Sequence, residues 1–142
     1  MRESAIIFRQ PDEKEFEQVK QVVEDLWLDD ENLKREQFHI ILDDGKVIAF
    51  GRLREHEDAI ELCTLGVSKD CQKKGLGGKM VKHLLSQANS DVYVVTVIPG
   101  FFAKFDFKFV ENYPASLQKK VKICCTNYNV GETYRVMKWE RK

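Results

Sequence analysis

The sequence predicts one mixed α/β domain, of the α+β kind, that spans residues 1–142. We expect a mostly antiparallel sheet with one parallel pair at its centre and helices on both faces. Three observations lead to this prediction. Strand-like apolar runs alternate with segments of helical periodicity, three strand-like runs follow one another within 36–67, and residues 59–98 are typical of a strand, a glycine-rich turn, a helix and a strand. A chain of this length can bury a single core without a metal or disulfide framework.

The first strand and the first helix have clear boundaries. Residues 5–8 form a short apolar run that Pro11 ends. Asp12 and Glu15 have the spacing of an acidic helix N-cap. Apolar side chains then recur at helical spacing, which predicts an amphipathic helix packed on a sheet. These side chains are Phe16, Val19, Val23, Leu26 and Trp27.

Three antiparallel strands should follow. Residues 36–42 alternate between apolar and polar as a half-buried strand does, and residues 43–45 (Asp-Asp-Gly) have the composition of a hairpin turn. Residues 46–54 return as the next strand, and the polar residues 55–58 reverse the chain again. The third strand is the apolar run 59–67.

The second half of the chain predicts a crossover and a less regular end. After an amphipathic helix, residues 91–98 are rich in β-branched side chains, so they should form a buried strand parallel to 59–67. We expect a short helix at 101–105, an edge strand at 108–111 and a last strand at 132–139. The pattern in 113–131 predicts no definite structure.

Composition excludes several classes of function. The chain carries 23 basic and 23 acidic residues and no net charge, which argues against nucleic acid or an anionic membrane as the main partner. No apolar run can cross a bilayer, and the N-terminus has no secretory signal, so we expect a cytoplasmic protein. We expect no metal site, because the four cysteines lack ligand spacing. They are Cys63, Cys71, Cys124 and Cys125.

The turn between the third strand and the following helix has the chemistry of an anion site. Glycines there free the backbone to take unusual φ values, and the first amides of the helix have no acceptors within it. With the helix dipole and nearby lysines, they suit a pyrophosphate. No Ser or Thr follows Lys79, so this is not a magnesium-nucleotide loop, and the spacing is not G-x-G-x-x-G. A plain strand-to-helix turn with solvated lysines is the alternative.

Residues 72–77, Gln-Lys-Lys-Gly-Leu-Gly, fit the pattern Gln-x-x-Gly-x-Gly. This segment resembles the acetyl-CoA loop of the GCN5-related N-acetyltransferases, the GNAT family, and the expected order of elements is similar to the GNAT fold throughout. Residues 101–107 look like the family's Phe-Tyr-x-Lys-x-Gly-Phe segment, with Phe102 and Asp106 in place of Tyr and Gly. Residues 101–105 (Phe-Phe-Ala-Lys-Phe), followed by 117–121 (Leu-Gln-Lys-Lys-Val) and Cys124, loosely resemble the C-terminal part of GNAT domains related to N-acetylglutamate synthases.

The resemblance implies where acetyl-CoA would bind. Its pantetheine arm would lie where the strand at 65–67 separates from its parallel neighbour at 94–97, because backbone groups left unpaired there can bond an inserted chain. A bulge at Gly66 would open that gap. The implied acetyl-CoA-binding residues are Leu65, Gly66, Val67, Gln72, Lys73, Lys74, Gly75, Leu76, Gly77, Gly78 and Lys79.

Glu61 is the candidate catalytic residue. It is the only charged residue in 59–67, and it matches by register the glutamate that acts as general base in histone acetyltransferases of the family. An ion pair with Arg52 or Arg54 is the alternative role. A backbone amide of residues 65–67 could polarise the thioester. Phe102 cannot supply the proton that the family's tyrosine would donate. The substitutes that stay open are Tyr113, Tyr128, Tyr134, Cys124 and water.

The resemblance therefore implies an acetyl-CoA-dependent N-acetyltransferase that acts directly on a primary amine of a small molecule, an amino acid being one candidate. Two alternatives stay open: a catalytically silent acyl-CoA-binding sensor or regulatory module, which Phe102 favours, and an enzyme that acetylates lysines or N-termini of proteins or peptides. We expect acetyl-CoA and the amine as partners, and a monomer or homodimer. Cations that could hold a substrate carboxylate are Arg52, Arg54, Lys119 and Arg135.

Overall fold

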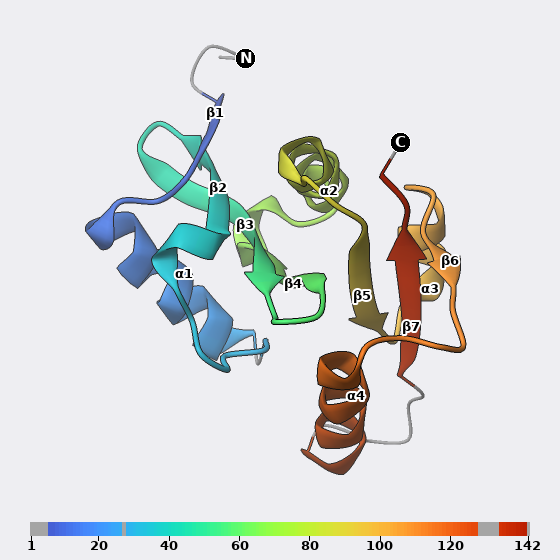
Figure 1. The fold of residues 1–142 in the computed structure, drawn as a ribbon. Helices are drawn as coiled ribbons and strands as arrows, with labels where there is room; N and C mark the ends of the chain where they lie inside the picture. Colours follow the sequence, from blue (N-terminus) through green and yellow to red (C-terminus); the bar gives the residue numbers. More distant parts are fainter. Residues whose placement is uncertain (1–5, 27, 128–133, 142) are drawn as a thin grey trace. The chain divides into compact units, whose positions relative to one another are not determined.

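The computed structural model describes residues 6–26, 28–127 and 134–141, and Figure 1 shows the elements that it contains. The described residues form a mixed seven-stranded sheet in the order β1-β2-β3-β4-β5-β7-β6, which confirms the predicted fold class. Contacts divide the chain into two compact units, Met1–Leu53 with Leu62–Gln87 and Arg54–Glu61 with Ala88–Lys142. The boundary falls within strand β4 (Ile60–Val67). Within the described ranges, no helix is long and apolar enough to span a bilayer.

The sheet of the first unit is antiparallel where its register is defined. Strand β1 (Ile6–Arg9) pairs with β2 (Phe38–Asp43), and β2 pairs with β3 (Lys46–Glu55). The expected hairpin turn between β2 and β3 is confirmed. Asp44 has φ +51° and Gly45 has φ +79°, so both central residues are left-handed, as in the turns that match the twist of paired strands.

Helix α1 (Glu13–Asp25) begins where the sequence predicts. The Asp12 carboxylate accepts a hydrogen bond from the Glu15 amide at 2.8 Å, and the Glu15 carboxylate accepts one from the Asp12 amide at 2.9 Å. This reciprocal capping satisfies two amides that the helix itself leaves unpaired. Phe16, Val19 and Val23 face the core as expected, whereas Trp27 lies outside the described residues.

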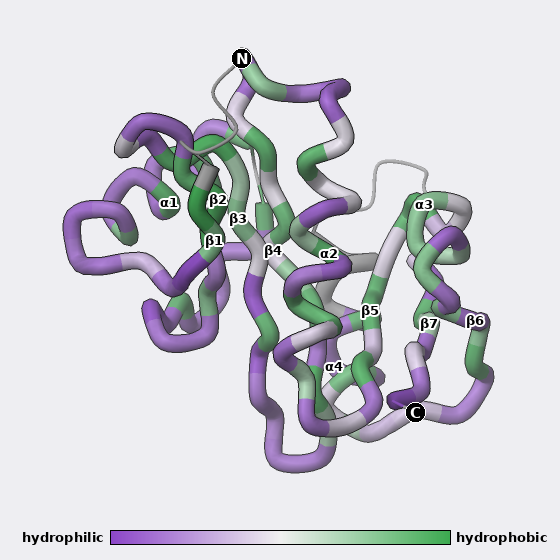
Figure 2. The backbone as a smooth tube through the Cα atoms, turned by 90° about the horizontal axis from the view of Figure 1, so that it is seen from above, coloured by the Kyte–Doolittle hydropathy of each residue, from purple (hydrophilic) through white to green (hydrophobic). Residues whose placement is uncertain are grey.

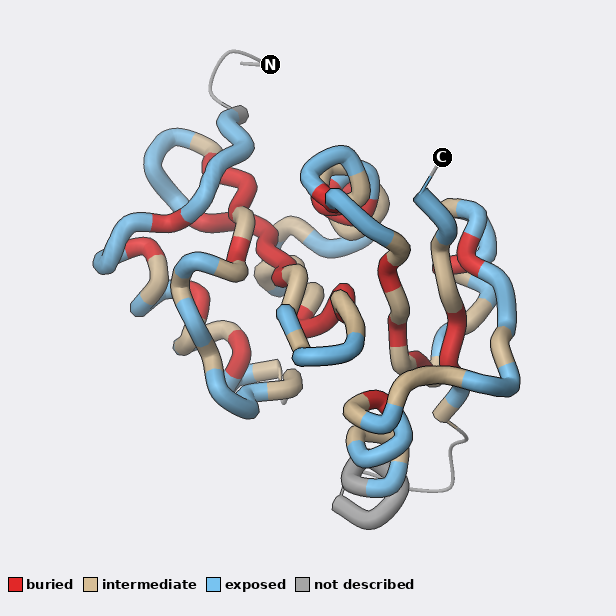
Figure 3. The backbone as a smooth tube through the Cα atoms, in the orientation of Figure 1, coloured by how far each residue is buried: buried red, intermediate tan, exposed pale blue. Residues whose placement is uncertain are grey.

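The core of the first unit lies between α1 and strands β2 and β3. Hydrophobic residues concentrate along these strands (Figure 2), and the same stretches are the most completely buried (Figure 3). Helix α2 (Leu76–Gln87) contacts β2 and buries Met80, Val81 and Leu84. The side chains buried in the core cluster are Val19, Val23, Phe38, Ile40, Leu42, Val47 and Phe50.

The second unit contains the parallel pair. Glu61 of β4 lies opposite Tyr93 of β5 (Val92–Thr96) in parallel register, as the crossover prediction requires. β5 then pairs antiparallel with β7 (Arg135–Trp139), and β7 with the short β6 (Lys108–Phe109). Helix α3 (Pro99–Ala103) contacts β7, and α4 (Ala115–Asn127) contacts β5.

Several boundaries differ from the sequence prediction. The segment expected to start a strand at residue 36 begins with a 3-10 turn, Arg35–Gln37, so β2 starts at Phe38. The short helix begins at Pro99 because proline fits the first helical position, whose amide needs no partner. The edge strand is reduced to β6, and β7 starts at Arg135. Helix α4 occupies a segment for which the sequence predicted no structure.

Candidate active site

The predicted anion loop connects β4 to α2 within the first unit. After a 3-10 turn at Lys69–Cys71, the Gln72 amide Nε2 donates to the Val67 carbonyl oxygen at 3.0 Å, which ties the loop to the end of its strand. Lys73 has φ +67° and Gly75 has φ +80°, so the chain turns sharply before the helix. The Lys79 amide then donates to the Gly75 carbonyl.

The residues of this loop fit an anionic ligand. The amides of the first helical turn have no intrahelical acceptor, and Gly77 and Gly78 put no side chain over them. A Cβ at Gly75 would meet nothing within 4 Å, so its surroundings are open. The lysines Lys73, Lys74 and Lys79 are exposed, and Leu76 is buried where it anchors the start of α2. Their role in holding the pyrophosphate of coenzyme A stays a prediction.

The strand that leads into the loop is irregular at Thr64 rather than at Gly66. Thr64 has φ +51°, which is costly for a β-branched residue unless its surroundings hold it. Its hydroxyl donates to the Asp29 carbonyl at 3.0 Å and accepts a hydrogen bond from Arg52 Nε at 2.8 Å. Gly66 packs tightly instead, because a Cβ there would lie 2.5 Å from Phe50 Cζ. The coenzyme slot beside 65–67 stays a prediction.

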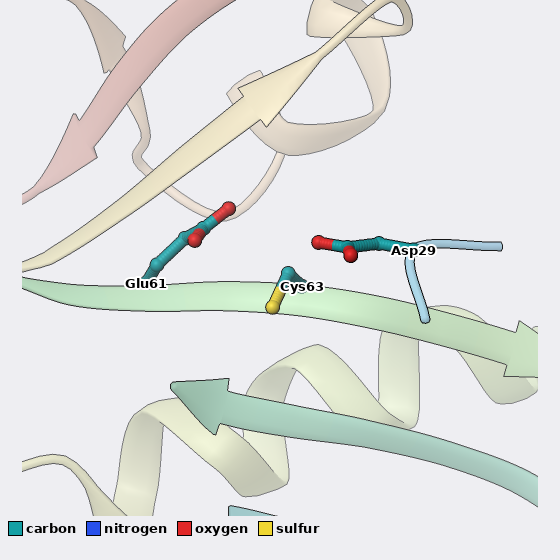
Figure 4. Close-up of side chains that lie close together, drawn as sticks. All are labelled: Asp29, Glu61 and Cys63. Carbon is teal, nitrogen blue, oxygen red and sulfur yellow. The ribbon is translucent and has the colours of Figure 1, made fainter. Parts of the chain in front are cut away.

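Figure 4 shows the side chain of Glu61 on strand β4, near the start of that strand. This side chain is fully buried. Its Oε1 is 2.9 Å from Nε2 of His56, and its Oε2 is ion-paired with the ammonium group of Lys120. All three residues belong to the second unit. The imidazole is 12% exposed and the Lys120 side chain 13%, so the carboxylate is reached through these two groups.

Hydrogen bonds of the adjoining turn hold this cluster in place. The His56 amide donates to the Ala59 carbonyl at 2.8 Å, which closes the turn between β3 and β4. Asp58, in the same turn, accepts hydrogen bonds from the hydroxyl and the amide of Ser116, near the start of α4. These bonds, chiefly the one from the hydroxyl, lower the pKa of the Asp58 carboxyl group. These bonds connect the turn to α4, the helix that carries Lys120.

Sequence reasoning assigned no role to His56 and left Lys120 in a segment without predicted structure. A histidine five residues before a candidate base is a usable signal, because residues that flank a tight turn come close together. Lys120 lies 59 residues from Glu61, and no local pattern indicates that contact.

Arg52 does not have the free guanidinium group that a substrate carboxylate would need. Its side chain is fully buried in the first unit. Besides Thr64, it bonds the carbonyls of Asn32 and Glu31 and pairs with the Asp29 carboxylate at 3.7 Å. These contacts give Arg52 a structural role. The role of Arg54 as a partner of Glu61 stays a prediction.

Phe102, at the family's tyrosine position, is buried rather than presented to solvent. Its ring makes edge-to-face contacts with Phe101 and Phe107, with centroid distances of 5.0 and 5.5 Å. Of the substitute acids, Tyr128 and the side chain of Cys124 lie outside the described residues, and Tyr113 and Tyr134 are partly exposed. The proton donor to the leaving thiolate is therefore not assigned.

A mixed sheet with a central parallel pair, followed by a glycine-rich anion loop and a helix, is the arrangement of acyl-CoA-dependent acetyltransferases. The model of the acetyltransferase (GNAT) family matches residues 5–107, and the chain belongs to this family. The proteins of this family are acetyltransferases by its description. No curated protein sequence matches the chain significantly.

Solved structures share the fold at low sequence identity. N-acetylglutamate synthase from Neisseria gonorrhoeae, in complex with coenzyme A and N-acetyl-glutamate, matches 95% of this chain with 16% identity and a TM-score of 0.77. The chain covers only 35% of that protein. Rv2747 from Mycobacterium tuberculosis, in complex with CoA and NLQ, matches 96% of this chain and 99% of its own, with 20% identity and a TM-score of 0.74. Arabidopsis thaliana Naa50, in complex with a bisubstrate analogue, matches with 15% identity, 96% and 99% coverage, and a TM-score of 0.61.

Proposed function

We propose that residues 1–142 form one catalytic domain that transfers the acetyl group of acetyl-CoA directly to a primary amine of a small molecule. The observation that carries this proposal is the fully buried Glu61 carboxylate, which contacts both an imidazole and an ammonium group. Removing a carboxylate from water costs several kcal/mol, and the ion pair that it forms returns an energy of about the same size. Stability alone therefore does not explain why Glu61 is buried. A role in proton transfer from an amine would explain it.

The chemistry of the acceptor follows from the charge at this site. An amine is protonated near neutral pH and cannot attack a thioester until it loses a proton. A buried carboxylate whose partners are an imidazole and an ammonium group belongs to a cluster that can take up this proton. The likeness to N-acetylglutamate synthase supports an amino acid as the acceptor, and the likeness to Naa50 keeps a peptide N-terminus as the competing substrate.

The test is thiol release from acetyl-CoA in the presence of separate amine pools: amino acids, polyamines, aminoglycosides and a peptide. We expect one pool to release thiol and Glu61→Gln to lower that rate by about 10²-fold or more, because proton transfer contributes on this scale. Glu61→Gln must first bind coenzyme A with wild-type affinity, which shows that the domain is folded. If no pool releases thiol from the wild-type protein while coenzyme A raises its melting temperature, a binding module replaces the enzyme.

A further inference from the structure

Two side chains lie between the Glu61 carboxylate and solvent, and one of them is His56, which is 12% exposed. The Glu61 carboxylate has no exposed surface, and each of its oxygens already has a partner. The His56 ring reaches solvent, and no described residue bonds its Nδ1 atom. An acceptor amine can therefore contact the imidazole without rearranging the buried carboxylate.

The contacts of Glu61 determine which ring nitrogen carries the proton. A carboxylate paired with an ammonium group accepts hydrogen bonds and donates none. His56 Nε2, 2.9 Å from Oε1, must therefore be the N–H donor, which leaves the lone pair of a neutral imidazole on Nδ1. An ionised carboxylate on one ring nitrogen orients the ring and stabilises the imidazolium that forms when the other nitrogen takes a proton.

We propose that His56 is the catalytic residue that accepts the proton of the acceptor amine and that Glu61 is the positioning residue behind it. This proposal rests on the proposed function and extends it to the atom that performs the transfer. The ammonium group of the acceptor gives one proton to His56 Nδ1. The neutral amine then attacks the thioester, the N–C bond forms and the C–S bond breaks. The second amine proton goes with the leaving thiolate, and His56 releases its proton to solvent.

The charges around His56 favour this step. Glu61 on β4 and Asp58 in the adjoining turn are both negative, and the electrostatic interaction between Asp58 and His56 acts in the attractive direction. Lys120 on α4 is positive, and it is bound to the far oxygen of Glu61. An imidazolium at His56 thus faces two carboxylates and one ammonium group. An arginine or lysine in place of His56 would bond Glu61 but would have no lone pair at the operating pH.

The discriminating variant is His56→Gln, because the glutamine amide can still donate to Glu61 but cannot accept a proton. With acetyl-CoA and the amine pool that the wild type uses, we expect a loss of about 10²-fold or more in the rate. His56→Ala should lose as much and recover part of the rate when imidazole is added to the solution. His39→Ala, which changes a histidine of the first unit, is the control and should not respond to imidazole.

The dependence of rate on pH separates a catalytic role from a structural one. The wild-type rate should rise with pH along a limb set by one titrating group, and this limb should be absent in His56→Gln. In Glu61→Gln the limb should move to lower pH, since no carboxylate then stabilises the imidazolium. The proposal is overturned if His56→Gln keeps the wild-type rate, or keeps the wild-type limb at a lower rate. If the wild type acetylates no amine, the proposed function is wrong, and this inference, which rests on it, is wrong as well.

Discussion

Arg52 and Glu61 are both fully buried charged side chains, and they are stabilised in different ways. The Arg52 guanidinium group is surrounded by carbonyl oxygens and a hydroxyl, with one carboxylate at 3.7 Å. Glu61 depends on one ammonium group and one imidazole. The fixed acceptors hold the Arg52 guanidinium group in place, whereas the two partners of Glu61 reach solvent. Of the two, the group suited to proton transfer is therefore the cluster that Glu61 forms with His56 and Lys120.

The close packing at Gly66 yields a prediction for stability. A methyl group there would lie 2.5 Å from Phe50 Cζ and 2.9 Å from Leu28 Cδ1. Gly66→Ala should therefore lower the free energy of unfolding by about 1–3 kcal/mol, as overpacking does in other cores. Chemical denaturation monitored by tryptophan fluorescence measures this change.

The matched control is Gly100→Ala, because a Cβ there would have no neighbour within 4 Å and the residue lies in helix α3. Alanine should leave the free energy of unfolding unchanged or raise it slightly, since it favours a helix more than glycine does. Equal losses in the two variants would show that packing at Gly66 is not the cause.

At the scale of elements, a pair of histidines connects β2 to α2, the helix that follows the anion loop. His39 Nδ1 lies 2.9 Å from His83 Nε2, and the Phe8 ring contacts His83 at a centroid distance of 5.2 Å. Such a bond needs at least one neutral ring as acceptor. Burial lowers the pKa of both imidazoles, and the charge of His83 lowers that of His39 further.

This pair predicts a loss of stability in mild acid. Because the folded pKa values lie below the ordinary value of 6.5, the stabilisation is complete above that pH and is lost as the pH falls through the folded values. The double variant His39→Gln, His83→Gln removes both titrating groups. Its urea midpoint should fall less than that of the wild type between about pH 7 and pH 5. Equal falls in the two proteins would contradict this role.

Local signals predicted some elements well and others poorly. Helix α1 was predicted because Asp12 and Glu15 cap it and its apolar stripe is regular. Helix α4 was missed because residues 115–127 (ASLQKKVKICCTN) have no such stripe and end in β-branched and polar residues that favour helices weakly. Its position depends on tertiary contacts with β5 and on the bond from Ser116 to Asp58.

The same distinction holds for the candidate site. A lone acidic residue in an apolar strand made Glu61 recognisable, and glycine spacing made the anion loop recognisable. The close packing at Gly66 was not predicted, because glycine in a strand can reflect either a bulge or a close neighbour, and the sequence does not show where Phe50 lies. The contact between Glu61 and Lys120 could not be predicted, because the two residues are 59 positions apart and only the tertiary fold brings them together.

At the scale of the whole molecule, balanced charge makes the anion loop a local positive region on a neutral protein. If coenzyme A binds there, it should raise the free energy of unfolding, because it binds the folded protein only. Mass action gives about 2.7 kcal/mol at a concentration 100 times its Kd. Replacing all three loop lysines by glutamine should weaken coenzyme A binding and leave the melting temperature without ligand nearly unchanged, because these side chains are exposed. They are Lys73, Lys74 and Lys79.

The control removes the same amount of charge elsewhere in the first unit, with Lys14, Lys20 and Lys34 replaced by glutamine. Isothermal calorimetry at two salt concentrations compares the three proteins. Wild type and control should bind alike and lose affinity as salt rises, and the loop variant should bind weakly at both. Equal binding by loop variant and control would mean that helix amides alone hold the ligand.

The separation of Glu61 from Lys120 also bears on how the protein is made. Lys120 follows Glu61 by 59 residues, so at about 5–20 residues per second the ribosome adds it roughly 3–12 s later. Until then the nascent chain contains a carboxylate that has no ammonium partner and resists burial. The ion pair that accompanies the burial of Glu61 can therefore form only after α4 has been synthesised.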